Sequence, residues 1–220
     1  MSKTQRNLRV ILSILAVSAL FFGFFGFFFS ISDIYKDVAK LDKQSPLHEI
    51  KGVAVDSQGN LYYGTSQHSA IQVYNNEGNF IYGFSFPTGG AGYFAFYIDD
   101  DDYIHIATAR TNCTYIFLYG ELIEKKEYVN SQESSDTINQ YDNISRQSRI
   151  FRDENGNTYT VKYNNKVYMY DDSGNYLRTI SPNAPLWPLS VFGFWGIAAI
   201  GMATLFVVNR KFFSELFKKV

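Results

Sequence analysis

Carboxylate and amide side chains gather at two places where they could bind a metal. Residues 99–102 are four consecutive aspartates, and residues 153–157 place carboxylate and amide oxygens at alternate positions. Oxygen ligands of this kind suit calcium. The same residue types also favour β-turns, and their recurrence at corresponding points of a repeat supports the turn interpretation. We therefore expect no metal or cofactor. If a metal does bind, the candidate ligands are Asp99, Asp101, Asp153 and Asn155.

No residue pattern of a known catalytic site is present. His48, His68 and His105 are scattered, without the spacing of a zinc site or a catalytic trio. The sequence also lacks a nucleophile elbow, a phosphate loop and a dinucleotide fingerprint. Cys113 is the single cysteine, which excludes an internal disulfide and predicts a small buried side chain. The sequence thus predicts a protein that is not an enzyme.

The elements around these polar clusters read as strands and turns. Short aromatic and β-branched runs alternate with Asp, Asn and Gly clusters, which is typical of antiparallel β-structure. Residues 55–62 (VDSQGNLY) match residues 151–159 (FRDENGNTY) with Asp56 on Asp153, and a weaker copy lies at 98–105 (IDDDDYIH). Residues 71–80 (IQVYNNEGNF) likewise match 167–176 (VYMYDDSGNY). The turn markers of the repeat are Asp56, Gly59, Gly78, Asp99, Asp153, Gly156 and Gly174.

Each marker has a physical role in a turn. An Asp at the end of a strand accepts hydrogen bonds from the amides of the turn, and Gly or Asn at its tip tolerates positive φ. Each unit is then two hairpins, with repeats at about 50–87, 92–128 and 149–181. A polar stretch between the last two, roughly 130–148, is predicted to be an exposed loop.

The first repeat resembles a blade of the NHL-type β-propellers. The resemblance rests on residues 52–62, 71–74 and 78–80, and it covers about 120 residues over the three repeats. The second repeat departs from the pattern, with Asp102 where the turn glycine is expected. The resemblance implies an all-β domain of propeller-like hairpin repeats. It also admits a lactonase-like enzyme, whose site would gather carboxylates and a metal at the central channel.

Three repeats are few for a propeller, because propellers typically close with four to eight blades. Residues 33–50 and 176–184 leave room for a partial fourth unit. Three interpretations are open: a small or incomplete propeller, two copies that combine, or an open sheet or sandwich. An open arc leaves strand edges that need a partner.

Two uncharged segments predict transmembrane helices, at residues 10–31 and 186–208. About 22 helical residues span roughly 33 Å, enough for a bilayer core of about 30 Å. A cleaved signal peptide is the alternative for the first segment, although hydrophobic regions of signal peptides are usually shorter. Glycines and alanines in both segments, among them Gly23, Gly26 and Gly201, would permit close helix packing. Neither segment contains an ionisable residue, which argues against a transporter formed by this chain alone.

Basic residues at both ends of the chain predict the topology. The segments 1–9 and 209–220 hold seven of the 20 basic residues, so both should be cytoplasmic and the domain at 32–185 extracytoplasmic. Residues 209–220 also have the spacing of an amphipathic tail. The Asn, Lys, Tyr, Ile and Phe content is typical of a low-GC bacterium, which indicates a cell membrane of bacterial origin. The expected interface anchors are Arg9, Trp187, Arg210 and Lys211.

The charge of the middle domain bears on its partners. Residues 32–185 carry 13 basic and 20 acidic residues, a net charge of −7, which argues against nucleic-acid binding. We therefore expect a membrane-anchored module that binds another envelope protein or itself. The alternatives are the lactonase-like enzyme and a sensor or accessory subunit of a membrane transport complex.

Overall fold

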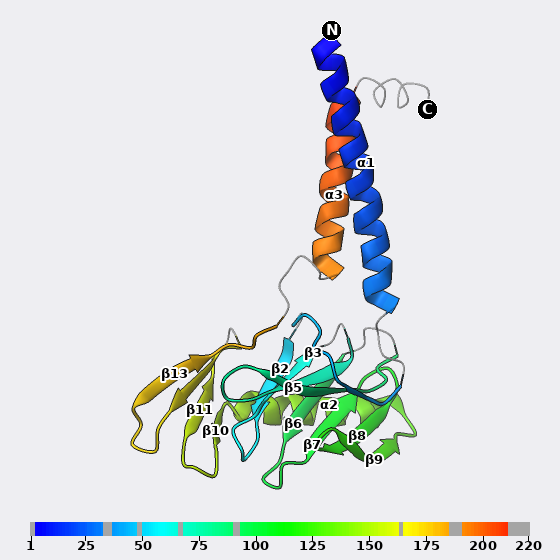
Figure 1. Ribbon diagram of the computed structural model, residues 1–220. Coiled ribbons are helices and arrows are strands. Elements are labelled where there is room, and N and C mark those ends of the chain that lie inside the picture. The colour runs from blue at the N-terminus through cyan, green and yellow to red at the C-terminus, as the bar shows by residue number, and fades with distance from the viewer. Residues whose placement is uncertain are drawn as a thin grey trace. The chain divides into compact units, whose positions relative to one another are not determined.

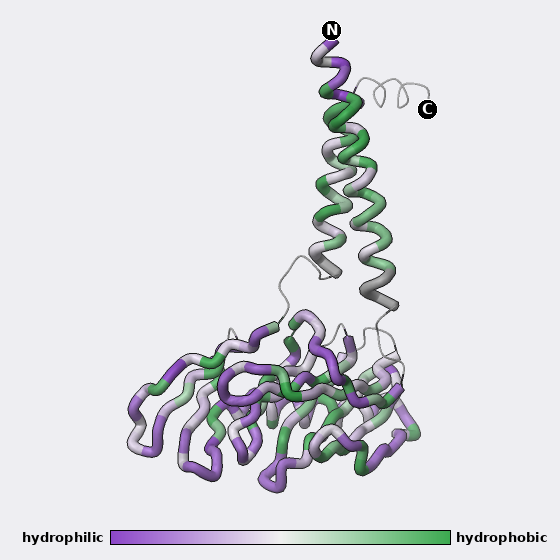
Figure 2. The backbone as a smooth tube through the Cα atoms, viewed as in Figure 1, coloured by the Kyte–Doolittle hydropathy of each residue, from purple (hydrophilic) through white to green (hydrophobic). Residues whose placement is uncertain are grey.

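The protein divides into two compact units. The computed structural model describes residues 3–32, 37–47, 50–65, 68–89, 93–162, 165–184 and 191–210. One unit holds the two ends of the chain, residues 1–33 and 186–220, and the other holds residues 34–185. Figure 2 shows long hydrophobic stretches along the helices of the first unit and hydrophilic turns in the second.

The first unit is an antiparallel pair of helices, α1 (Lys3–Ser32) and α3 (Val191–Val208). Glycines allow the close approach. A Cβ atom placed on Gly23 would lie 2.5 Å from the backbone of α3, and one on Gly201 would lie 2.7 Å from the backbone of α1. Near the other end of the pair, the Arg9 guanidinium donates to Asn209 Oδ1 at 3.0 Å. Gly23, Gly26 and Gly201 therefore lie at a packed interface, whereas a Cβ atom on Gly196 would meet nothing within 4 Å.

Within the described residues, one apolar stretch is long enough to cross a bilayer, Arg6–Phe28. An uncleaved anchor and a signal sequence both satisfy this criterion. Helix α1 begins seven residues earlier than the predicted span because no helix breaker separates its basic start from the apolar run. The apolar part of α3, Gly193–Val208, is shorter than a full span. The two predicted spans thus reduce to one clear candidate.

The second unit contains three antiparallel sheets, each an up-and-down meander of four consecutive strands, with β1 added beside β5 in the first sheet (Figure 1). The first sheet has the order β1-β5-β4-β3-β2, the second β6-β7-β8-β9 and the third β10-β11-β12-β13. The strands are β1 Ala39–Leu41, β2 Ile50–Val55, β3 Leu61–Thr65, β4 Ala70–Tyr74, β5 Phe80–Ser85, β6 Phe94–Ile98, β7 Ile104–Thr108, β8 Cys113–Leu118, β9 Glu121–Glu127, β10 Ile150–Arg152, β11 Thr158–Val161, β12 Val167–Tyr170 and β13 Tyr176–Ile180.

The first sheet lies between the other two. Every residue of β3 and β4 is buried, because alternate side chains face opposite neighbours. Ala54 and Tyr62 pack into a cluster with aromatic residues of the second sheet, including Phe96 and Phe117. Val53 and Tyr63 face the third sheet instead and join a cluster with its buried residues. Phe151 of β10 packs against both clusters, so the third sheet also reaches the cluster that holds the second-sheet residues.

Strands β1 and β13 do not form the partial fourth repeat for which residues 33–50 and 176–184 left room. Residues 39–41 pair with β5 at the edge of the first sheet, and residues 176–180 form the last strand of the third. The described part of the domain therefore contains three sheets, with the first one widened to five strands.

The polar stretch predicted as a loop is instead helix α2 (Ser131–Gln147). Asn130 caps its start by accepting a hydrogen bond from the Glu133 amide at 2.8 Å. Its apolar side is narrow: Ile138 is buried in a cluster with Ala95 and Ala107 of the second sheet, and Tyr141 packs against that cluster. The loop prediction was wrong because these few apolar residues gain their stability from the sheet. The domain is consequently largely β, but not all-β.

Candidate functional site

The first turn of each sheet is built around one aspartate and the residue six positions later. Asp56 accepts from the Asn60 amide at 2.7 Å and from the Tyr62 hydroxyl at 3.0 Å. The third sheet repeats this geometry: Asp153 Oδ1 accepts from the Asn157 amide at 2.8 Å and Asp153 Oδ2 accepts from the Tyr159 hydroxyl at 2.9 Å.

The second sheet has a histidine at the corresponding position. Asp99 accepts from the Tyr103 amide at 2.9 Å, and its other oxygen lies 2.7 Å from His105 Nε2. His105 therefore takes the place of Tyr62 and Tyr159 as the side chain that contacts the turn aspartate. Asp101 and Asn155 are exposed within these turns.

The three first turns meet one another at Ser57. Its amide and hydroxyl donate to the Asp102 carboxylate of the second sheet at 2.8 and 2.5 Å, and its carbonyl accepts from the Glu154 amide of the third at 2.8 Å. Asp102 has φ +63°, the left-handed conformation that the turn glycine would normally supply. The two bonds to Ser57 account for an aspartate at this strained position.

The marker glycines support these turns in different ways. Gly59, Gly78, Gly156 and Gly174 all have φ between +81° and +88°. Gly59 also lies against the hydroxyl of Tyr159, so a side chain there would enter the contact between the first and third sheets. Gly174 has only open space around it. Glycines of the same turn motif thus differ in role, because Gly59 also permits a contact between two sheets and Gly174 does not.

Asp56, Asp99 and Asp102 border a recess, but hydrogen bonds of the first turns already use their oxygens. The recess has a volume of about 350 Å³ and is lined by the ends of β2 and β6 and by β10. Among the described residues, no three His, Cys, Asp or Glu side chains are placed to hold one metal ion. The oxygens of Asp99 and Asp153 point to the amides, imidazole and hydroxyl of their own turns.

The second and third sheets flank the first, and they differ in how the face turned away from the first sheet, here called the outer face, is covered. The second sheet presents Ala95 and Ala107, which are small enough for α2 to lie across them. The outer face of the third sheet carries alternate residues of its strands, whereas the inner ones, such as Tyr159 and Val167, are fully buried. We define the outer face of the third sheet as Ile150, Arg152, Thr158, Thr160, Lys162, Tyr168, Tyr170 and Tyr176.

This face is open to solvent in the described structure. Ile150 is 70% exposed and Tyr176 is 56% exposed. The three tyrosines lie close together, with ring centroids of Tyr168 and Tyr170 at 6.4 and 6.0 Å from that of Tyr176. Buried and half-exposed residues alternate along β11 and β12, which is the pattern of a sheet with one open face. Strands β3 and β4 lack this alternation, because all of their residues are buried.

Comparison with solved structures finds several that resemble part of this chain at low identity. No protein family matches the sequence, and no curated protein matches it. Virginiamycin B lyase from Staphylococcus aureus aligns with 67% of this chain at 15% identity and a TM-score of 0.34. A protein of unknown function from Bacteroides caccae aligns with 61% at 16% identity and a TM-score of 0.32, and the WD40 repeats of RRP9 with 66% at 12% identity and 0.31. The matched region spans 46%, 46% and 41% of those chains, in the same order. Similarity at this level carries no inference about activity.

Two aspartates of the same turn motif should titrate with opposite effects on stability. Burial raises the pKa of Asp56 above its ordinary value of 3.8, whereas hydrogen bonds from Asn175 lower the pKa of the exposed Asp171. The contribution of Asp56 is full below pH 3.8 and is lost as pH rises through its folded pKa. That of Asp171 is present above pH 3.8 and is lost as pH falls through its folded pKa.

The test compares urea midpoints of the wild type with Asp56→Asn and Asp171→Asn between pH 3 and about pH 6. The stability advantage of the wild type over Asp56→Asn should shrink as pH rises. Its advantage over Asp171→Asn should grow. Parallel curves for the two variants would contradict the assignment of burial as the cause.

The predicted interface anchors are only partly within the described residues. Arg9 lies on α1 and is bonded to Asn209, and Arg210 is exposed after the end of α3. Trp187 and Lys211 lie outside the described residues, as does the tail from residue 211 onward.

Proposed function

We propose that this protein is a membrane-anchored interaction module whose outer face of the third sheet binds an acidic surface of another envelope protein. The observation that carries the proposal is the contrast between the two ends of the arc. Helix α2 covers the outer face of the second sheet. The corresponding face of the third sheet exposes a cluster of aromatic side chains where a further sheet would pack in a ring.

The chemistry of the face suits protein recognition. Tyrosine buries a large rigid area at a low entropic cost and is enriched in interfaces. Both charged side chains of the face, Arg152 and Lys162, are basic and exposed, and Lys162 Nζ lies 5.8 Å from the ring centroid of Tyr168. An otherwise acidic domain thus offers a basic, aromatic patch. A partner with carboxylates around an apolar centre would complement it.

Self-association through this face is less favourable than binding to another protein. Two copies facing each other would bring Arg152 and Lys162 of one close to the same residues of the other. Like charges opposed in an interface cost free energy, and this cost rises as water is excluded. We therefore propose a different protein with an acidic surface, rather than a second copy of this chain, as the partner.

The anchoring part of the proposal combines the helix pair with the charge of the chain ends. We infer that α1 and α3 both cross the membrane, with the termini cytoplasmic and residues 34–185 outside. Support comes from the apolar stretch Arg6–Phe28, from the packing of α3 against α1, and from the basic residues at both ends. Protease added to sealed vesicles with the extracytoplasmic side facing out should then degrade the domain and leave a terminal tag intact. Loss of the tag from such sealed vesicles would contradict this topology.

A photo-crosslinking experiment tests the interaction face. The photoreactive amino acid benzoylphenylalanine replaces Tyr176 in the full-length chain in native membranes. We expect one discrete adduct whose mass differs from twice that of the chain. The adduct should be lost when Arg152→Glu is added, because that change reverses a charge facing the acidic partner.

Tyr119 provides the matched control. It is an exposed tyrosine, 49% accessible, in the turn between β8 and β9. The same photoreactive residue there should give no such adduct. Absence of an adduct at position 176, an adduct that persists in Arg152→Glu, or an adduct of twice the chain mass would each overturn the proposal as stated.

A further inference from the structure

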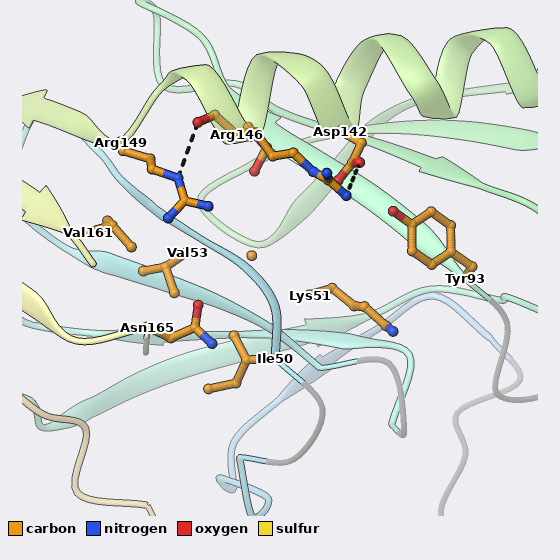
Figure 3. Close-up of a pocket in the computed structure, with 11 residues that line it drawn as sticks. Ile50, Lys51, Val53, Tyr93, Asp142, Arg146, Arg149, Val161 and Asn165 are labelled. Carbon is orange, nitrogen blue, oxygen red and sulfur yellow. Dashed lines mark hydrogen bonds and ion pairs between the residues drawn. The ribbon is translucent and has the colours of Figure 1, made fainter. Parts of the chain in front are cut away.

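A second cavity lies at the end of the inner strands opposite to the clustered turns. It has a volume of about 350 Å³, within the range of small-molecule sites. The start of β2, the last turns of α2 and the end of β11 form its walls (Figure 3). Val53 and Val161 are buried on one wall, so part of the lining is apolar.

The charge of this cavity is opposite to that of the domain. Lys51, Arg146 and Arg149 line it, and Asp142 is the one carboxylate among the lining residues that the structure describes. The domain as a whole carries a net charge of −7. Three cations around one recess of an acidic protein cost electrostatic repulsion, which an anion bound between them would relieve.

The cations have distinct positions. Arg146 Nη2 lies 2.8 Å from Asp142 Oδ2, so that pair is largely neutralised. Arg149 is half-buried, and its Nε donates to the Arg146 carbonyl at 3.2 Å, which fixes the direction of the side chain. Figure 3 shows its guanidinium pointing toward the same space as the amide of Asn165, from the opposite wall.

Lys51 and Tyr93 complete the rim of the cavity. The Lys51 ammonium lies 5.4 Å from the centroid of the Tyr93 ring. The Tyr93 hydroxyl lies near Asp142 and Arg146 in Figure 3. Burial, and then the Asp142 carboxylate, raise the pKa of Tyr93, so its hydroxyl keeps its proton at neutral pH. The rim thus offers a planar guanidinium, the ammonium of the exposed Lys51 side chain and neutral polar groups.

We propose that this cavity binds a small anion through a phosphate group, with Arg149 and Lys51 as its charged ligands. The fork of a guanidinium suits two phosphate oxygens, and a lysine adds a point charge. Val53 and Val161 would contact the organic part of the ligand. A soluble phosphate ester and the headgroup of an anionic lipid share this chemistry. The site is separate from the outer face of the third sheet and does not rest on the proposed function.

Thermal unfolding of the full-length chain in nanodiscs tests the site, because a ligand that binds only the folded state raises the midpoint. One arm adds glycerol 3-phosphate to phosphatidylcholine nanodiscs. The other replaces part of the phosphatidylcholine with phosphatidylglycerol and adds no soluble phosphate. A rise in the first arm identifies a soluble ligand, and a rise in the second alone identifies a lipid headgroup. Both support the proposal.

Variants show whether the rise comes from this cavity. Arg149→Gln and Lys51→Gln should each weaken binding about tenfold, the effect expected when one charged ligand is lost. Lys125→Gln is the control, since Lys125 is a partly exposed lysine on β9 outside the cavity lining. Lys51 is exposed, so its variant keeps the test valid if Arg149→Gln does not fold.

A change of the opposite sign sharpens the test. Asp142→Asn should strengthen binding severalfold, because it removes the carboxylate and leaves Arg146 available to the anion. Asp136→Asn, an exposed position on the same helix, should have no effect. The proposal is overturned if neither arm raises the midpoint, or if the rise is the same in Arg149→Gln, Lys51→Gln and Lys125→Gln.

Discussion

Replacement of Gly23 by leucine should separate α1 from α3. A Cβ atom on Gly23 would lie 2.5 Å from both Ala198 N and Phe194 O, and neither backbone atom can move away without displacing the helix. In the membrane placement proposed above, helix association depends on this close contact, since apolar side chains gain little from leaving lipid. We expect the helix pair to be lost, rather than weakened.

Disulfide formation between the two helices measures this effect. Ser13 Oγ and Asn209 Nδ2 are 3.3 Å apart, so Ser13→Cys with Asn209→Cys should crosslink on oxidation. The native Cys113 is buried and should not compete. The yield should fall at least about fivefold with Gly23→Leu, which corresponds to roughly 1 kcal/mol or more of lost association.

Gly196 supplies the matched control on α3. A Cβ atom there meets nothing within 4 Å, so Gly196→Leu should crosslink as well as the parent chain. Equal yields from Gly23→Leu and Gly196→Leu would show that the interface does not depend on the glycine contact.

Asp153→Ala should destabilise the domain far more than Asp171→Ala, although both aspartates begin the same kind of turn. Asp153 is 6% exposed, and its loss leaves the buried Tyr159 hydroxyl without its carboxylate partner. A stranded buried polar group together with lost charge-assisted bonds costs about 2–4 kcal/mol. Asp171 also bonds its turn, but those bonds are exposed, so we expect a much smaller loss from Asp171→Ala.

Pulse proteolysis of the full-length chain in urea measures this difference, because cleavage reports the unfolded fraction. Tyr159→Phe separates the two causes. It removes the hydroxyl and keeps the ring, so combining it with Asp153→Ala should cost less than the sum of the single changes. Similar losses from Asp153→Ala and Asp171→Ala would contradict the role assigned to burial.

Local chemistry made the turns and sheets predictable. An aspartate that caps a turn, a glycine or asparagine at positive φ and a β-branched or aromatic run act over a few residues, so the pattern is visible in the chain itself. The three antiparallel sheets follow from this pattern. Asp102 shows its limit, because the residue that makes an aspartate acceptable at φ +63° is Ser57, 45 positions away.

Helix α2 shows the same limit for a whole element. Its composition is that of a loop, and only Ile138 and Tyr141 reach the cluster on the second sheet. Its contacts with the second sheet include a pair of alanines on β6 and β7 and a hydrogen bond from Ser134 to the Thr108 carbonyl, which no local pattern around residues 131–147 could reveal.

What the sequence determined by itself was therefore the oxygen-rich residues, the turns they make and the apolar segments at the chain ends. What only the tertiary structure decided was the use of those residues. It placed Asp99 and Asp153, two of the candidate calcium ligands, against amides, a hydroxyl and an imidazole of their own turns. It also brought Lys51, Arg146 and Arg149 together from distant segments, because chemistry between elements depends on sheet order and burial, which local patterns do not encode.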